Sequence, residues 1–371
     1  MLLIPIYKAY IPEQSKEYAR KALESSWISS IGEYVERATD MLVDTLGCKH
    51  GILINNGTSA THLVAKALAY SHPEVKRVLV PSACYVAAYN SLLYDNFGWK
   101  IKAVDLDDTT WNMRVEEVRE EDAILAVHNL GNIINVPALK KKFGCVIAED
   151  NCEGFFGRYE GLEAGTASLC SSMSFFGNKN ITCGEGGAFL TNDTNLFEFI
   201  TKVKGQGQTN KRYIHDVLGY NYRMTNVQAA ILLGQLEVCE DIRKQKMRVF
   251  GRYRENLSGL IGIRLQVQES GTDHSMWMFG IRFDHLTSYD FAHDYFSRRG
   301  IETRPMFYPY TCHSHLKFDG DDSIAKEINN SVVVFPSYGQ LTDSEIDYIC
   351  EEVSTFSSQL SGLQSITSIT R

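Results

Sequence analysis

The sequence lacks the features of secreted, membrane-spanning and nucleic-acid-binding proteins. Its nine cysteines are an odd number and form no C-x-x-C pair, which argues against a disulfide framework. No run approaches the roughly eighteen apolar residues of a membrane span, and Pro5 interrupts the short apolar start. The net charge of -8 argues against a large basic surface for nucleic acid. We therefore expect a cytoplasmic protein with reduced thiols that binds neither membranes nor nucleic acid.

Patterns of metal ligands and nucleotide-binding loops are missing as well. The ten histidines include no H-x-x-x-H pair, and we interpret the nearest candidate, His313 and His315, as a solvated loop pair. The glycine-rich segment 184–187 lacks the G-K-[ST] of a nucleotide P-loop. We expect no bound metal ion.

The chain is long enough, at 371 residues, for two or three domains, and its eight prolines and lack of repeats suggest a compact protein. From about residue 50 to 190, short apolar runs alternate with helical patterns. This alternation predicts a largely parallel sheet with helices on both faces. The predicted strands are Gly51–Asn55, Arg77–Pro81, Ile101–Asp105, Ala123–Val127, Cys145–Glu149, Cys170–Phe176 and Ala188–Thr191. The predicted helices between them are Thr58–Tyr70, Tyr85–Tyr94 and Pro137–Phe143.

The pattern changes after Gly219. Residues Thr225–Asn256 predict a long amphipathic helix with a break near Glu240–Lys244. Further on, predicted strands and helices mix: Gly280–Phe283, Val332–Phe335, Tyr289–Arg299 and Asp343–Ser357. We therefore expect a large α/β domain over residues 1–250, with an N-terminal arm, and a smaller α+β domain over residues 251–371.

Two charged residues follow predicted strands and point to chemistry. Lys179 lies just past the strand Cys170–Phe176 and before a glycine-rich turn, and a partly desolvated lysine there is a usable nucleophile. Asp150 ends the strand Cys145–Glu149, and ligands of open α/β sheets bind beyond the carboxyl ends of their strands. Taken singly, a solvated lysine and a helix-capping aspartate explain them as well.

Other residues suggest an anion site and an aromatic plate. Thr58 and Ser59 follow a strand and open a helix, where free N–H groups and hydroxyls can bind a phosphate. Ser174 can add a hydroxyl, and Tyr85 can stack on a planar ring. Alone, these residues would be a capping turn, a strand-end serine and a core tyrosine. A phosphate cradle, an aromatic ring, a carboxylate for a ring nitrogen and an amine together match pyridoxal 5'-phosphate.

The sequence resembles the sugar-nucleotide aminotransferases of the DegT/DnrJ/StrS type, which are fold type I pyridoxal phosphate enzymes. The resemblance covers nearly the whole chain. The motifs that carry it are WISSIGEYVERA (27–38), NNGTSATHLV (55–64), the P-S-x-x-Y-V-A segment (81–87), EDNCEG (149–154), SFFGNKNITCGEGG (174–187), GYNYRMTNVQAA (219–230), TRPMFYP (303–309) and FPSYGQLTDSEID (335–347). The resemblance implies a seven-stranded, mostly parallel sheet, a smaller C-terminal domain, and a homodimer with active sites at its interface.

The resemblance also implies a role for each matching residue. Lys179 would hold the cofactor covalently and act as the base in catalysis, and Asp150 would pair with the pyridine nitrogen. Thr58, Ser59 and Ser174 would bind the phosphate. Tyr85 would cover the ring, and Asn221 would reach the cofactor phosphate of the neighbouring subunit.

Glu153 separates this chain from most relatives, which carry glutamine beside the ring hydroxyl. A glutamate there resembles the perosamine- and viosamine-type enzymes, which implies transfer from L-glutamate, released as 2-oxoglutarate, to C4 of a nucleotide-linked 4-keto-6-deoxyhexose. Trp27, Arg223 and Arg304 are candidate substrate-binding residues, because arginine forks suit carboxylates and diphosphates; surface or interface ion pairs explain the arginines equally well.

Three functions remain in competition at this point. The first is the 4-aminotransferase, with GDP, UDP and dTDP all open as the nucleotide. The second is a 3-aminotransferase that acts on a 3-keto sugar nucleotide. The third is a non-catalytic sugar-nucleotide-binding protein, against which the complete set of Lys179, Asp150 and Ser174 argues.

Overall fold

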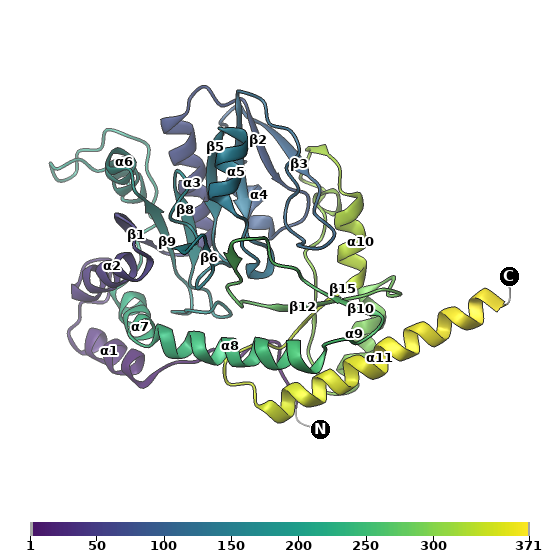
Figure 1. Ribbon diagram of the computed structural model, residues 1–371. Coiled ribbons are helices and arrows are strands. Elements are labelled where there is room, and N and C mark those ends of the chain that lie inside the picture. The colour runs from purple at the N-terminus through teal and green to yellow at the C-terminus, as the bar shows by residue number, and fades with distance from the viewer. Residues whose placement is uncertain (1–2, 370–371) are drawn as a thin grey trace.

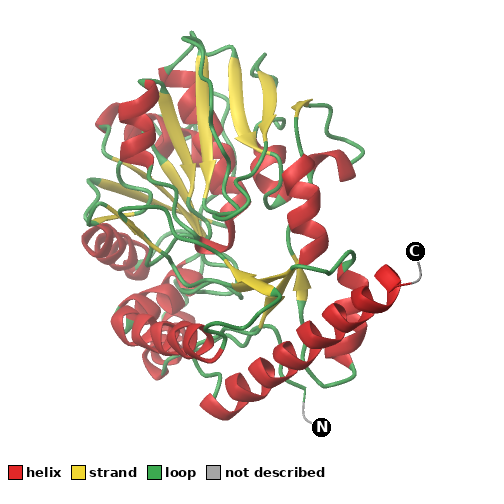
Figure 2. Cartoon of the chain, turned by 45° about the vertical axis from the view of Figure 1, so that its right-hand side comes forward, coloured by secondary structure: helices red, strands yellow, loops and turns green. Residues whose placement is uncertain are grey.

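The largest part of the structure is an eight-stranded twisted sheet with helices on both faces (Figures 1 and 2). The computed structural model describes residues 3–369. The strand order is β1-β9-β8-β5-β4-β2-β3-β14, and every neighbouring pair is parallel except those that β9 forms with β1 and β8. The strands are β1 (His50–Ile54), β2 (Arg77–Pro81), β3 (Lys100–Val104), β4 (Asp122–Val127), β5 (Val146–Asp150), β8 (Ser171–Ser174), β9 (Gly187–Thr191) and β14 (Asp319–Gly320).

The predicted α/β fold with a mostly parallel sheet is confirmed. Seven strands agree with the seven predicted apolar runs to within two residues. The eighth, β14, is a two-residue edge strand from the C-terminal part of the chain, and no pattern in the sequence indicated it.

Alternating side chains of each strand explain why both faces are covered. Ile52 and Ile54 of β1 pack in one core with three helices, whereas Leu53 packs on the opposite face with two others. The first group of helices is α3 (Gly57–Ser71), α4 (Val86–Ser91) and α6 (Thr194–Lys204). The second is α2 (Glu33–Leu46) and α7 (Asn226–Leu236), with α1 (Glu13–Glu24) against α7 and α5 (Val136–Phe143) beside β5.

The predicted long helix over Thr225–Asn256 is two helices, and its break was placed wrongly. The chain leaves helical geometry at Val238, between α7 and α8 (Cys239–Asn256), so the predicted break near Glu240–Lys244 falls inside α8. The break lets α7 pack on the large sheet while α8 runs on to a second core (Figure 1).

A second, antiparallel sheet lies in the C-terminal part of the chain. Its order is β10 (Ile263–Leu265), β12 (Phe279–Phe283), β15 (Val332–Phe335) and β13 (Arg304–Pro305). It shares a core with α8, α9 (Tyr289–Ser297) and α11 (Asp343–Ile369), the last of which is longer than predicted. The remaining elements are β6 (Arg158–Tyr159), β7 (Leu162–Glu163), β11 (Thr272–Asp273), α10 (Ser323–Ser331) and the 3-10 turns Asn129–Gly131 and Tyr310–Cys312.

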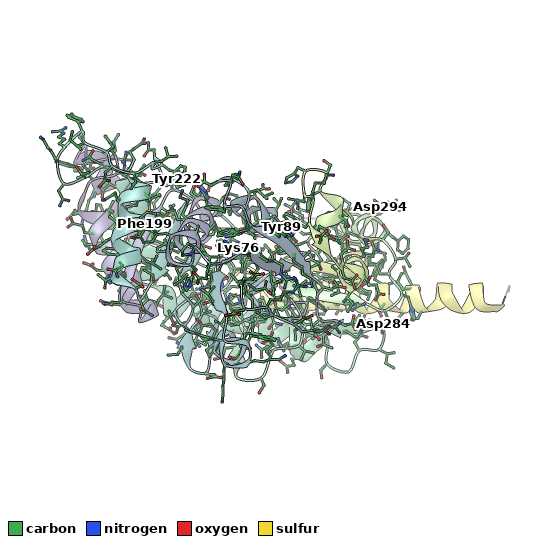
Figure 3. The ribbon with its side chains drawn as sticks, turned by 90° about the horizontal axis from the view of Figure 1, so that it is seen from above. Lys76, Tyr89, Phe199, Tyr222, Asp284 and Asp294 are labelled. Carbon is green, nitrogen blue, oxygen red and sulfur yellow. The ribbon has the colours of Figure 1, made fainter. Side chains whose placement is uncertain are left out.

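The two halves of the chain are interleaved. Ile4 donates its N–H to Gly300 and accepts from Glu302 through its carbonyl, and the N–H of Ile6 donates to the Glu302 carboxylate. Seen from above, Phe199 on α6 and Asp294 on α9 lie at opposite ends of the molecule (Figure 3). A domain boundary at residue 250, which would fall inside α8, stays a prediction.

The described residues include no candidate membrane span and no disulfide bond. Between residues 3 and 369, no helix combines the length and the apolar character needed to cross a membrane. The nine cysteines, all of them within this range, are free thiols.

A buried ion pair at the start of two central strands should stabilise the sheet. Arg77 donates to both carboxylate oxygens of Asp122, at 2.7 and 2.5 Å, and the Asp122 side chain is fully buried. We expect Asp122→Asn to lower the free energy of unfolding by about 3 kcal/mol, because the partly buried guanidinium of Arg77 loses its charged partner. Urea denaturation measures this change.

The control is Glu13→Gln, which removes the exposed ion pair with Lys16. We expect this variant to stay within about 0.5 kcal/mol of the unchanged protein. Equal losses in the two variants would contradict the role of the buried pair.

Candidate active site

A large cavity opens beyond the carboxyl ends of the parallel strands. Its volume is about 1010 Å³, and residues from both halves of the chain line it. Eight of the predicted site residues are in its lining: Thr58, Ser59, Tyr85, Asp150, Glu153, Ser174, Lys179 and Arg304. The structure therefore brings together residues that are up to 246 positions apart, from Thr58 to Arg304.

The anion site forms where α3 begins against the end of β8. A Cβ on Gly57 would lie 2.7 Å from the Cβ of Ser174, and one on Gly187 would lie 2.6 Å from the Asn56 carbonyl oxygen. Only glycines permit this approach, which places Thr58 and Ser59 beside Ser174. Asn56 caps α3 by accepting the N–H of Ser59 at 2.8 Å. The helix N-terminus, with N–H groups outside the helical ladder, favours a bound anion.

Asp150 lies at the end of β5 with its carboxylate fixed and buried. Its Oδ1 accepts the N–H of Cys152 at 3.1 Å and the hydroxyl of Ser172 at 3.5 Å. Its Oδ2 accepts the hydroxyl of Thr61 at 3.4 Å. Because three donors hold it, this carboxylate keeps one orientation at the cavity and suits a cationic ring nitrogen.

A buried hydrogen-bonded pair, His128 and Glu149, lies next to Asp150 and was not predicted from the sequence. Nδ1 of His128 accepts the N–H of Ile134 at 3.1 Å, so we assign the ring proton to Nε2, which donates to Glu149 at 3.0 Å. Glu149 also accepts the hydroxyl of Tyr159 at 3.2 Å. These contacts fix the strand end that carries Asp150. No spacing in the sequence links His128 with Glu149.

Lys179 lies between a carboxylate and an aromatic ring. Its Nζ is 3.8 Å from Oε1 of Glu153 and 3.8 Å from the ring centroid of Trp277. Glu153 is 5% exposed, and its Oε2 accepts the N–H of Leu130 at 2.9 Å. Burial raises the pKa of Glu153 to about 7 even though Lys179 opposes the shift. Near neutral pH this carboxyl therefore exists in both protonation states.

The opposite wall of the cavity is more open. Tyr85 precedes α4, is exposed, and lies 6.2 Å from Phe307 between ring centroids. Arg304 also faces the cavity, and it donates to Glu302 at 2.9 Å. Arg304 therefore forms an ion pair with Glu302 and also lines the cavity, so both of the roles considered for it have a counterpart in the structure.

Three predicted residues do not line the cavity: Trp27, Asn221 and Arg223. Trp27 is exposed, and its carbonyl accepts from the side chain of Asn226 at 2.7 Å. Asn221 is exposed on the segment that pairs with Gly205, and Arg223 pairs through its backbone with Ile54. None of the three lines the cavity of its own chain, so the predicted roles of Trp27, Asn221 and Arg223 stay predictions.

Other lining residues were not predicted as site residues, although Tyr222 and Tyr308 belong to the motifs that carry the family resemblance. Tyr222, labelled in Figure 3, lies on the segment after α6 and donates to or accepts from His62 at 3.1 Å. Trp277, Tyr308 and His313 come from the C-terminal part of the chain. Their positions depend on how the two halves pack, which no local pattern records.

Comparison with known proteins settles the family. The model of the DegT/DnrJ/EryC1/StrS aminotransferase family matches residues 9–354. The chain belongs to this family. It is 34% identical over 368 residues to a GDP-perosamine synthase from Escherichia coli O157:H7, covering 96% of this chain and 99% of that protein. It is 30% identical to a GDP-perosamine synthase from Vibrio cholerae, covering 95% and 99%.

Solved structures agree on the fold. The structure of the E. coli GDP-4-keto-6-deoxy-D-mannose-3-dehydratase with bound hydrated PLP matches with a TM-score of 0.88 at 21% identity, covering 95% of this chain and 100% of that one. Family membership makes this protein a pyridoxal phosphate-dependent aminotransferase, as predicted.

The residues of the cavity fit this cofactor. The N-terminus of α3 with three hydroxyls suits the phosphate, Asp150 suits the ring nitrogen, and Lys179 supplies the amine between them. Within residues 3–369, no group of three or more His, Cys, Asp or Glu residues is placed to hold a metal ion.

The shifted pKa of Glu153 predicts how stability depends on pH in the cofactor-free protein. Between its ordinary value of 4.5 and about 7, the folded protein keeps a proton that the unfolded chain releases. We therefore expect the free energy of unfolding to fall by up to about 3 kcal/mol as the pH rises through this window. Glu153→Gln should remove this decline. Urea denaturation at several pH values measures both curves, and parallel curves would contradict the shift.

Proposed function

We propose that the protein is a nucleotide-sugar 4-aminotransferase, which transfers the amino group of L-glutamate to C4 of a GDP-linked 4-keto-6-deoxyhexose. Its products would be 2-oxoglutarate and a 4-amino-4,6-dideoxy sugar nucleotide of the perosamine type. Similarity to GDP-perosamine synthases over nearly the full chain supports the substrate. The observation that carries the chemistry is the position of Lys179, between the buried Glu153 and the ring of Trp277 and in one cavity with Asp150 and the anion site.

Each residue of the site has a defined task in this proposal. Thr58, Ser59 and Ser174 bind the cofactor phosphate at the start of α3. When bound, pyridoxal phosphate acts as an electron sink for the carbon that loses its proton. Asp150 holds the proton on the ring nitrogen, and Nζ of Lys179 moves the proton between the substrate carbon and the cofactor.

Glu153 keeps the Lys179 amine close to the reacting atoms. Its carboxyl lies 3.8 Å from Nζ, and the N–H of Leu130 fixes its other oxygen. Because its pKa is about 7, it can hold or release a proton beside the amine near neutral pH.

The substrate would enter through the open wall of the cavity. Tyr85 covers the cofactor ring from one side, and Arg304 is available for the diphosphate or the donor carboxylate. The cavity volume of about 1010 Å³ leaves room for a nucleotide sugar beside the cofactor.

A second copy of the chain would complete the site. The segment after α6 extends away from the body in Figure 1 and exposes the large apolar side chains of Tyr213, Ile214 and Leu218. Leu218 is 80% exposed, which is unusual for a residue without a partner. Asn221 follows on the same segment, so a homodimer would bring it to the neighbouring cavity. Trp27 and Arg223 would join that interface. The cytoplasmic location and the lack of contacts with nucleic acid or membranes stay predictions.

A 3-aminotransferase is the second candidate. The chain is 30% identical over 267 residues to the UDP-2-acetamido-2-deoxy-3-oxo-D-glucuronate aminotransferase of Pseudomonas aeruginosa, which covers 70% of this chain. The coverage is smaller than for the GDP-perosamine synthases, so transfer to C4 is the better-supported proposal.

Replacement of Lys179 tests the mechanism. We expect Lys179→Ala to abolish the visible absorbance of the bound cofactor and to lower turnover with glutamate by at least about a thousandfold, because both nucleophile and base are lost. Lys100→Ala, which removes an exposed lysine outside the cavity, is the matched control and should stay fully active. Normal turnover by the Lys179 variant would refute the mechanism.

The same assay identifies the acceptor. GDP-, UDP- and dTDP-linked 4-keto-6-deoxyhexoses and a UDP-linked 3-keto sugar are compared side by side, with mass spectrometry of the aminated product. We expect amination of the GDP-linked 4-keto sugar. Preference for the 3-keto sugar would replace the first candidate by the second.

Mixing two impaired variants, Lys179→Ala and Asn221→Ala, tests whether the sites are shared. Asn221→Ala should be impaired because the neighbouring site loses a phosphate contact. If each site uses Lys179 of one chain and Asn221 of the other, refolded mixtures of the two variants contain hybrids with one intact site. Equal mixtures should then regain about a quarter of normal activity. Activity no higher than the mean of the separate variants would show that the sites are not shared.

A further inference from the structure

Trp277 contacts both ends of Lys179. The amine lies 3.8 Å from the centroid of its ring, and its indole N–H donates at 2.9 Å to the carbonyl of Asn178, the residue before Lys179. The side chain of Trp277 is largely buried and lines the cavity. One aromatic residue therefore fixes the backbone from which the lysine starts and the place where its amine ends.

The backbone of Trp277 is itself held. Its carbonyl accepts from Nζ of Lys246 at 2.9 Å and from the hydroxyl of Ser337 at 3.3 Å. Lys246 extends from α8, and Ser337 follows β15. The ring position is thus set by two elements of the C-terminal core, while the lysine belongs to the large sheet.

Lys246 is an unusual residue for such a task. Its amine is fully buried, and its hydrogen bonds go to the carbonyls of Trp277 and Ser337. Among the ion pairs of the described residues, none includes Lys246. Burial lowers its pKa to about 7. The amine also lies 5.5 Å from the ring centroid of Phe250, so two carbonyls and one aromatic ring hold it in place.

We propose that Trp277 is a positioning residue: its ring face holds the amine of Lys179 whenever that amine is not bound to the cofactor, and Lys246 and Ser337 fix the ring. The inference rests on the proposed role of Lys179. A free lysine side chain has many rotamers, and an aromatic face attracts its ammonium group through the electrostatic field of the ring. Without the ring face of Trp277, the Lys179 side chain would adopt many rotamers, and its amine would return to the cofactor more slowly.

The test measures cofactor attachment apart from turnover. Cofactor-free protein is mixed with pyridoxal phosphate, and the rate of covalent attachment is followed by the rise of visible absorbance. We expect Trp277→Leu to slow attachment and to lower kcat by about tenfold, the amount that loss of a desolvated cation–π contact predicts. KM for glutamate should stay within about twofold, because the lost contact is with Lys179 and not with the donor.

Two further variants separate positioning from simple loss of structure. Trp277→Phe keeps a ring face but loses the N–H, and we expect it to recover most of the attachment rate. Lys246→Met leaves the tryptophan in place but removes its anchor, and should slow attachment by about threefold, through less ordered ring geometry. The control is Trp99→Leu, which removes a partly buried indole stacked on Phe97 outside the cavity and should leave attachment unchanged.

Several outcomes would overturn the inference. Attachment within twofold of normal in Trp277→Leu would show that the ring does not place the amine, and equal loss in the Phe and Leu variants would assign the effect to the N–H alone. If Trp277→Leu does not fold, as judged by its melting temperature, the Phe and Met variants decide the question. Failure of the proposed mechanism itself would appear separately, as activity in Lys179→Ala.

Discussion

The whole site depends on the close approach of α3 to the end of β8. Any side chain on Gly57 or Gly187 would collide with Ser174 or with the backbone at Asn56. At this junction the helix N-terminus, the phosphate-binding hydroxyls and the strand that leads to Lys179 all meet. The positions of Asp150 and Lys179 relative to the anion site follow from it, because Asp150 ends β5, the strand beside β8, and Lys179 follows the end of β8. Pyridoxal phosphate would therefore have its phosphate held at the start of α3 and the Lys179 amine within the same cavity.

The second half of the chain supplies further residues around the cavity. It contributes Trp277 against the lysine, Arg304 and Phe307 on the open wall, and the buried Lys246 behind them. Asp150 and Lys179 thus follow strands of the large sheet, whereas Trp277, Arg304 and Phe307 come from the C-terminal part of the chain. Such a division allows relatives to share chemistry while they accept different sugars.

Much of the large sheet and of the cofactor site could be predicted because the signals are local. Apolar runs of four to seven residues indicate seven of the strands, and Asn56–Ser59 and Glu149–Asp150 directly follow or end two of them. The break at Val238, the added strand β14 and the contact between His128 and Glu149 could not be predicted, since each depends on packing between distant segments. Asn221 and Arg223 lie outside the cavity of their own chain, so a single chain does not test the roles proposed for them.

The pairing of Ile4 with residues 300–302 has a consequence for synthesis of the protein on the ribosome. The segment around Ile4 is made well before residues 300–302, with which it forms its hydrogen bonds. Until then, its apolar side chains lack the residues of the C-terminal part against which they pack, although the large sheet can already assemble. Because Ile6 and Tyr7 line the cavity, the substrate pocket becomes complete only in this late step. Bulky fusions ahead of this segment would therefore act on the last stage of maturation and leave the early sheet untouched.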